Sequence, residues 1–194
     1  MSISNEDSKK SRIAKAAMEL FAAKGFEATS VQEIVNRAEV NKAMLFYYFQ
    51  SKEKLFSYLL REYFNVFTKE IKEAISPENA PDKNLRNIMD IIVRQRTHQN
   101  RFAMEKIAAE LKESSSEIAG YIDEELGKFV KVVAGEIRRG IDAMMFREIN
   151  EELTAMSMIG VMAIFSRVEK KNGPYDDDEI RKFLENFYLE GIRL

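Results

Sequence analysis

The stretch IAKAAMELFAAKGFEATSVQEIVNRAEVNKAMLFYYFQSKEKLF, residues 13–56, decides how the whole chain is interpreted. Its apolar side chains recur every three or four residues, which is the spacing of amphipathic α-helices, and turn signals interrupt the recurrence. Gly25 can adopt the left-handed conformation that ends a helix over residues 8–24. Ser30 and Glu33 have the spacing of a capping box, so a second helix is expected after Thr29 or Ser30.

A third short helix follows closely. A tight turn at Glu39 and Val40 leads to Asn41, the expected N-cap of a helix that runs through Tyr48. Two short helices joined by a tight turn, the second apolar on one side and polar on the other, are the pattern of a helix-turn-helix. Leu45 would anchor the second helix, and its polar side would enter the major groove of DNA.

The rest of the chain also has helical spacing. Three prolines and eight glycines in 194 residues leave room for long helices. We expect a long helix from a cap at Ser51 to Ile75 and a loop around Pro77 and Pro81. Further helices are expected near residues 84–98, 101–112, 115–139, 150–171 and 177–193. Ser114 and Glu117 suggest a cap for the helix at 115–139, and Asp176 and Glu179 suggest one for the helix at 177–193.

These elements predict an all-α fold of about nine helices. An N-terminal three-helix helix-turn-helix DNA-binding domain over residues 1–51 is joined to a larger helical ligand-binding and dimerisation domain over residues 52–194. Charge alone does not identify a DNA-binding protein. Residues 1–54 contain nine Lys and Arg against seven Asp and Glu, whereas the remainder contains 21 against 25.

Composition narrows the classes of function. The chain has no cysteine and a single histidine, His98, so thiol chemistry, disulfides and a histidine metal cluster are not expected. Acidic runs such as Asp176 to Asp178 are typical of solvated helix ends, and we expect no catalytic residue, no metal and no cofactor. The first residues lack the apolar core of a signal peptide, and no apolar run approaches about 20 residues. A cytoplasmic protein without membrane contact is therefore expected.

The opening stretch resembles the DNA-binding domain of the TetR family of repressors. The matching features keep one register through four helices: Phe21, Gly25-Phe26, Thr29-Ser30, Ala38-Glu39-Val40, Leu45-Phe46-Tyr47-Tyr48-Phe49 and Ser51-Lys52-Glu53. The resemblance implies a one-component bacterial repressor that binds near-palindromic double-stranded operator DNA as a homodimer. It also implies release by a small, largely apolar effector of unknown identity, and association with the nucleoid when DNA is bound.

Three residues depart from the family pattern. Glu39 stands where a turn glycine is usual, so a left-handed conformation there would cost energy. Met44 stands where threonine is common and offers a thymine methyl an apolar contact without a hydrogen bond. Phe46 lacks the phenolic hydroxyl that a tyrosine offers a phosphate. These departures concern the operator sequence and leave the expected fold unchanged.

The resemblance implies DNA contacts of two kinds. Thr29 and Ser30 would contact phosphates at the N-terminus of the second helix. The other implied contacts with the phosphate backbone are those of Tyr47, Tyr48 and Lys52. Lys42 is expected to contact base edges, with guanine acceptors as the preferred partners. The side chains expected to line the same surface are Asn41, Ala43 and Met44.

The last two helices carry more apolar surface than one outer face requires. By resemblance they form the dimer interface, for which we expect Met158, Met162, Phe165, Ile180, Phe183, Leu184, Phe187 and Tyr188. The alternative is that both helices simply complete the core of one chain.

An effector pocket is expected between the connecting helix and the dimer helices, by the same resemblance. Its candidate lining is Phe64, Phe67, Met89, Ile92, Val93, Phe102, Met104, Ile107, Tyr121, Leu126 and Phe129. Most of these residues would be ordinary core in any helical protein. His98 could orient a ligand, but a surface or capping position is more typical of such a histidine. An enzyme and a helical scaffold that binds another protein are the rival functions. Binding of the purified chain to its own promoter separates the scaffold from the regulator.

Overall fold

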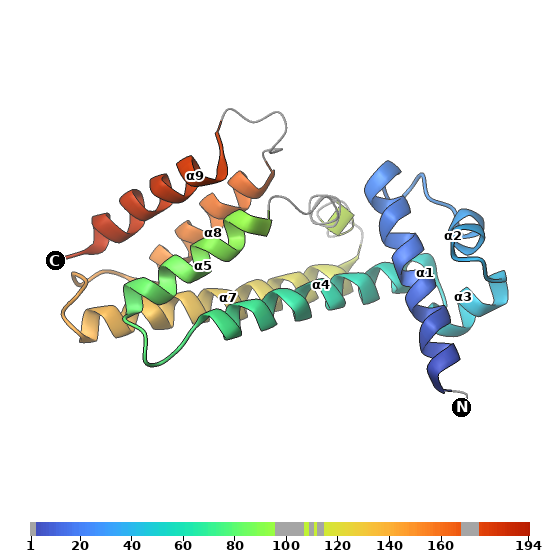
Figure 1. Cartoon of the computed structure of the whole chain (residues 1–194), viewed down its shortest axis with the longest axis horizontal. Coiled ribbons are helices and arrows are strands. Elements are labelled where there is room, and N and C mark those ends of the chain that lie inside the picture. The colour runs from blue at the N-terminus through green and yellow to red at the C-terminus, as the bar shows by residue number, and fades with distance from the viewer. Residues whose placement is uncertain (1–2, 96–106, 109–110, 112–114, 168–174) are drawn as a thin grey trace. The chain divides into compact units, whose positions relative to one another are not determined.

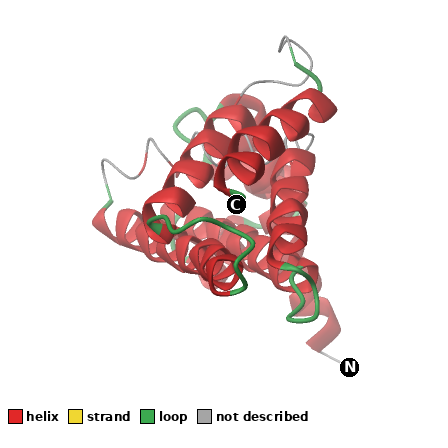
Figure 2. Ribbon diagram, turned by 90° about the vertical axis from the view of Figure 1, so that its left-hand side faces the viewer, coloured by secondary structure: helices red, strands yellow, loops and turns green. Residues whose placement is uncertain are grey.

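The computed structural model describes residues 3–95, 107–108, 111, 115–167 and 175–194. Within these residues the regular structure is helical, as Figure 2 shows, and the β-type pairing is limited to one antiparallel bridge between Phe146 and Arg193. The predicted all-α fold is confirmed. Among the described helices, none combines the length and the apolar character needed to cross a membrane.

The chain divides into two compact units. Unit 1 consists of Met1–Asn65 and Gln99–Ala119, and unit 2 of Val66–His98 and Gly120–Leu194. The division falls within two long helices, residues 52–74 and 116–142, whereas the domain boundary expected from the sequence, after residue 51, falls where the first of these helices begins. As a functional boundary, residue 51 stays a prediction.

Unit 1 is built on three helices and the start of a fourth (Figure 1). They are α1 (Ile3–Lys24), α2 (Val31–Ala38), α3 (Lys42–Phe49) and α4 (Lys52–Ala74), and α1 packs against both α2 and α3. The rings of Phe21, Phe26 and Phe56 form one buried cluster, with centroids 5.2 to 6.1 Å apart. Because these rings come from α1, from the loop after it and from α4, they fix the frame that carries α2 and α3.

The two turns of unit 1 follow the sequence signals. Gly25 has φ +86°, and its N–H donates to the carbonyl of Phe21, as expected for the left-handed end of α1. Glu39 has φ 51° and ψ 48° between α2 and α3. The guanidinium of Arg12 donates to the carbonyl oxygen of Glu39 at 3.0 Å and pairs with its carboxylate at 3.1 Å. Arg12 therefore holds a non-glycine residue in the left-handed turn.

Unit 2 contains the remainder of α4, then α5 (Pro81–Gln95), most of α7 (Ser116–Asp142), α8 (Glu151–Arg167) and α9 (Asp177–Leu184). The helix after Leu184 widens into a π-helical segment, Glu185–Glu190, which the sequence did not predict. Helix α5 packs against α8 and α9, and the shared core gathers apolar side chains from all of these helices. Three ion pairs reinforce the α5 side of this packing: Asp82 with Arg193, Arg86 with Glu185, and Asp90 with Arg181.

A buried polar cluster joins the loop before α5 to α7. The amide of Asn84, fully buried, donates to the carbonyl of Ser76 at 2.9 Å and to the carboxylate of Glu136 at 3.0 Å. Arg139 pairs with the same carboxylate at 2.7 Å and donates to the carbonyl of Asn79 at 3.2 Å. Every member has a partner, so the cluster stabilises unit 2 and does not leave a buried charge alone.

The capping signals in the sequence predict where helices begin more accurately than the sequence predicts how long the helices are. The capping boxes at Ser30 and at Asp176 are both present. The hydroxyl of Ser115 accepts from the N–H of Ile118 at 3.3 Å at the start of α7, whereas Ser114, the predicted cap, lies outside the described residues. The helix expected at 101–112 lies mostly outside the described residues, as do His98 and the predicted end of the 150–171 helix.

Candidate nucleic-acid interface

Helices α2 and α3 form the predicted helix-turn-helix. The N–H of Val40 donates to the carbonyl of Val35 at 3.0 Å, which closes the turn after α2. Asn41 begins α3, because its side-chain oxygen accepts from the N–H of Met44 at 2.9 Å. Leu45 and Phe49 are buried and anchor α3 to the rest of unit 1. The opposite side of α3 is held outward.

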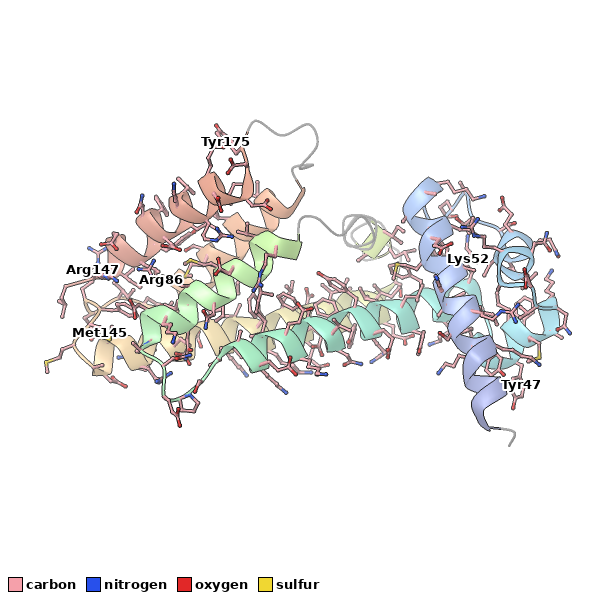
Figure 3. All side chains as sticks on the ribbon, viewed as in Figure 1. Tyr47, Lys52, Arg86, Met145, Arg147 and Tyr175 are labelled. Atoms are coloured by element: carbon pink, nitrogen blue, oxygen red, sulfur yellow. The ribbon has the colours of Figure 1, made fainter. Side chains whose placement is uncertain are left out.

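The outward side of α3 consists of four residues, Lys42, Ala43, Phe46 and Tyr47, all of them exposed. We call these residues the α3 face. Phe46 is 41% exposed and Tyr47 70%, and the ammonium of Lys42 lies 5.8 Å from the centre of the Phe46 ring. Figure 3 shows Tyr47 projecting from the helix-turn-helix. Residues spaced by three or four are neighbours on a helix surface, and the pairs 42/46, 43/46 and 43/47 have this spacing, so these side chains form a continuous surface.

Two residues predicted to face DNA are less available than expected. Met44 is half-buried, so the α3 face does not include it. Tyr48 is also half-buried, and its ring lies 5.1 Å from that of Tyr47 and 6.3 Å from that of Phe49. The pattern missed the contribution of Phe46, although its spacing of four residues from Lys42 was a usable signal.

The N-terminus of α2 already has an anion beside it. The Ser30 hydroxyl donates to the Glu33 carboxylate at 2.7 Å and accepts from the Glu33 N–H at 3.2 Å, and Lys24 pairs with the same carboxylate. The Lys24 ammonium, followed by the backbone and hydroxyl of Ser30, lowers the pKa of Glu33 to about 2. Thr29 is buried, and its hydroxyl donates to the carbonyl of Gly25 at 2.7 Å. A phosphate contact by Thr29 or Ser30 therefore remains a prediction.

Lys52 has a structural role that the sequence did not reveal. Its ammonium donates to the carbonyls of Phe26 and Thr29, at 2.9 and 3.1 Å, and lies 4.2 Å from the centre of the Phe26 ring. These contacts join the start of α4 to the loop between α1 and α2. A phosphate contact by Lys52 would have to use the remaining hydrogen of the same ammonium.

Several other basic side chains of unit 1 are engaged in ion pairs. Arg37 binds Glu19 at 2.7 Å, in addition to the pairs of Arg12 and Lys24 described above. Lys10, which the sequence analysis did not single out, has its ammonium 4.4 Å from the ring centre of Tyr58. Lys42 is the one basic residue of α3, and its side chain is exposed. It is therefore well placed for a contact with a base.

The residues predicted to line an effector pocket divide among several environments. In unit 2, Phe67, Met89, Ile92 and Val93 are part of the packed core, and the ring of Phe129 meets that of Phe67 edge-on at 5.2 Å. Phe64 and Ile107 belong to unit 1, Tyr121 is half-buried and Leu126 is exposed. Phe102 and Met104 lie outside the described residues.

The residues predicted for a dimer interface separate into a buried and an exposed set. Met158, Ile180, Leu184 and Tyr188 are buried in the core of the single chain, which agrees with the alternative that these helices complete that core, and their part in a dimer interface stays a prediction. Their apolar surface is satisfied by α5 and α7 within the same chain. Phe183 and Phe187 are exposed, and their rings stack at 5.6 Å. The side chains of Met162 and Phe165 lie outside the described part of α8.

Comparison with known proteins finds the same N-terminal region. The family described as bacterial regulatory proteins, tetR family, matches residues 13–59. The probable HTH-type transcriptional regulator YttP of Bacillus subtilis (strain 168) is 36% identical over 95 residues, which is 47% of this chain and 46% of YttP. The uncharacterized HTH-type transcriptional regulator YhgD of the same organism is 27% identical over 191 residues, 95% of this chain and 96% of YhgD.

Solved structures share the arrangement of helices. The crystal structure of AibR in complex with isovaleryl coenzyme A and operator DNA has a TM-score of 0.77 and 21% identity, and the match covers 92% of this chain and 97% of AibR. At this identity the likeness concerns the fold. The matched region of YttP, by contrast, is confined to less than half of that protein.

Proposed function

The chain belongs to the TetR family of bacterial regulatory proteins and is a DNA-binding transcriptional regulator, and we propose that it is a repressor released from its operator by a small molecule. The observation that carries the proposal is the α3 face, which is held outward by two buried anchors and a closed turn. This is the geometry with which a recognition helix enters the major groove. The family consists of regulators, so catalysis is the less favoured reading.

The DNA contacts that we propose have two parts. Lys42 would donate to guanine acceptors, and Ala43 and Tyr47 would lie against the same groove. Ser30, Asn41 and the backbone around them would contact phosphates and set the register of the head on the duplex. A single head buries little surface, so tight binding requires two heads that engage successive major grooves about 34–36 Å apart. The operator would accordingly be nearly palindromic.

The homodimer that this requires is supported by apolar surface on unit 2. Leu153, Met156 and Ile164 of α8 are exposed, as are Phe183 and Phe187 after them. We propose that the exposed part of α8 and α9 meets the same surface of a second copy. Burial of several such side chains removes apolar area from water, which contributes about 25 cal/mol for each Å².

We propose that the effector is a small and largely apolar molecule. Phe67, Phe129 and Met89 pack together in the core of unit 2, so this ligand would have to separate such side chains in order to bind among them. AibR, which has the same fold, was crystallised with both an acyl-coenzyme A and operator DNA. A ligand releases the operator only if it binds more tightly to a conformation that holds DNA poorly. We place the protein in the cytoplasm, on the nucleoid when DNA is bound.

Binding to promoter DNA tests the proposal directly. Fluorescence anisotropy with duplex DNA from upstream of the chain's own gene should show tight, sequence-dependent binding, weakened by some members of a panel of small apolar acids and acyl thioesters. A reporter fused to the same promoter should be more active when the gene is deleted. Equal affinity for promoter and random duplexes would favour the helical scaffold, and a less active reporter would indicate an activator.

Phe187→Asp tests the dimer. Because Phe187 is 60% exposed, the new charge is tolerated in a single chain but not in an apolar interface. We expect a folded monomer by sedimentation, with operator affinity near the non-specific level. Lys182→Asp, at an exposed position of α9 five residues before Phe187, is the matched control and should remain dimeric. A dimeric Phe187→Asp variant with unchanged DNA binding would place the interface elsewhere.

A further inference from the structure

The α3 face has an unusual chemical composition for a surface that reads DNA. Its members are one cation, Lys42, one methyl group, Ala43, and two rings, Phe46 and Tyr47. Lys42 can donate to the acceptors of a guanine, but none of the four is an arginine, asparagine or glutamine, the other side chains that make bidentate hydrogen bonds to guanine or adenine. The α3 face therefore presents mainly carbon atoms to the edges of the bases.

The polar groups next to the α3 face are already engaged. The side-chain oxygen of Asn41 accepts from the N–H of Met44 at 2.9 Å and caps the helix. In α2, the amide of Gln32 donates to the side-chain oxygen of Asn36 at 2.8 Å, and Arg37 is paired with Glu19. A bidentate contact of the Asn41 or Gln32 amide with a base, or a contact of Arg37, would therefore compete with a contact within the protein.

We propose that Ala43 and Phe46 recognise the 5-methyl groups of thymine in the major groove, so that the methyl pattern of the operator, beside the Lys42 contact, determines specificity. This rests on the proposed function, in which α3 is the recognition helix. Thymine alone among the four bases presents a methyl group in the major groove, and apolar side chains are its natural contacts. Lys42 lies beside the Phe46 ring, so one side of the helix reads a guanine and an adjacent thymine methyl together.

The inference predicts an effect that no hydrogen-bond reader would show. Replacing thymine by uracil removes the methyl group and keeps the O4 acceptor, so the hydrogen-bonding pattern in the groove is unchanged. One buried methyl contributes about 0.8 kcal/mol, which corresponds to about a fourfold change in affinity. Two symmetric half-sites would double that free energy, giving about a fifteenfold loss when both methyls are removed.

The experiment uses the full chain and operators selected from a random duplex library. Each thymine of the best duplex is replaced in turn by uracil, in both half-sites, and affinity is measured by anisotropy at one fixed salt concentration. We expect about a fifteenfold loss at one or two symmetric thymine positions. At those positions, cytosine opposite guanine should bind better when it carries a 5-methyl group than when it does not.

Variants assign the methyl contact to its residues. At a thymine that Phe46 contacts, Phe46→Ala should bind the thymine and uracil duplexes with nearly equal affinity, whereas Lys42→Met should bind both more weakly and keep the ratio between them. Failure to select any preferred sequence would defeat the proposed function itself. A preferred sequence whose affinity is insensitive to every uracil replacement would overturn this inference alone. Because the replacement is made in the DNA, the wild-type result stands even if a variant fails to fold.

Discussion

Replacing Lys52 by methionine separates a structural lysine from a DNA-contacting one. The ammonium of Lys52 donates to two backbone carbonyls, those of Phe26 and Thr29, and lies over the Phe26 ring. Methionine keeps much of the side chain's length and apolar stem but removes the charge and all three donors. The loop between α1 and α2 would then lose its attachment to the start of α4.

The expected loss follows from the contacts. A hydrogen bond that involves a charged group contributes about 1.5–3 kcal/mol, and a cation–π contact at a partly exposed site about 0.5–1 kcal/mol. The three contacts share one ammonium and are not additive. We therefore expect Lys52→Met to lower the free energy of unfolding by about 2–3 kcal/mol. For a chain of 194 residues this corresponds to a fall in Tm of about 4–12 °C.

The assay pairs thermal unfolding with the salt dependence of DNA binding. Lys42→Met is the matched control, because Lys42 is exposed on α3 and its removal should change stability by less than about 0.5 kcal/mol. It should nevertheless weaken operator binding. Lys52→Met should show the opposite result, with a lower Tm and a slope of log affinity against log salt close to that of the wild type. An unchanged Tm with a slope reduced by about one unit would make Lys52 a phosphate contact and refute this reasoning.

Three further predictions concern stability. A Cβ on Gly140 would lie 2.0 Å from the buried ring of Phe146, so Gly140→Ala should cost about 1–3 kcal/mol in denaturant unfolding. Asn84→Leu removes a buried donor to the Glu136 carboxylate and should cost about 1–3 kcal/mol by the same measurement. Because the pKa of Glu33 is lowered, its carboxylate contributes to folding stability at pH values above its ordinary pKa of 4.5, and this contribution is lost as the pH falls towards about 2. Wild type should accordingly lose more Tm over that interval than Glu33→Gln.

Each of these predictions has an outcome that contradicts it. Gly135→Ala, in the same helix as Gly140, meets no atom within 4 Å and should gain up to about 1 kcal/mol, so equal effects at both glycines would exclude the ring clash. A neutral Asn84→Leu would show that the apolar side chain replaces the polar cluster without loss. Parallel acid profiles for wild type and Glu33→Gln would show that the carboxylate contributes nothing to folding.

The parts of the fold that the sequence predicted are those determined within a few residues. Ser30 and Glu33 form their capping box by contacts three residues apart, and the turn at Gly25 needs only its own φ. The role of Lys52 could not be found in this way, because its partners are 23 and 26 residues away. The same holds for Arg12, which supports the turn at Glu39 from a distance of 27 residues. Local signals predict where helices begin, whereas tertiary contacts decide what a charged side chain does.

The last helix shows how far periodicity can separate a core from an interface. Ile180, Leu184 and Tyr188 are spaced by four and form one buried stripe, while Phe183 and Phe187, also spaced by four, form the exposed stripe beside it. In the sequence, adjacent stripes merge into a single wide apolar face. Periodicity predicts the width of that face, but it does not predict where on the face the chain's own core ends. The boundary between the buried and the exposed stripe depends on where α5 packs, and this is determined by tertiary structure. It also decides which substitution can test dimerisation, since a charge at Leu184 would unfold the chain, whereas a charge at Phe187 would be resisted only by the second copy of the proposed dimer.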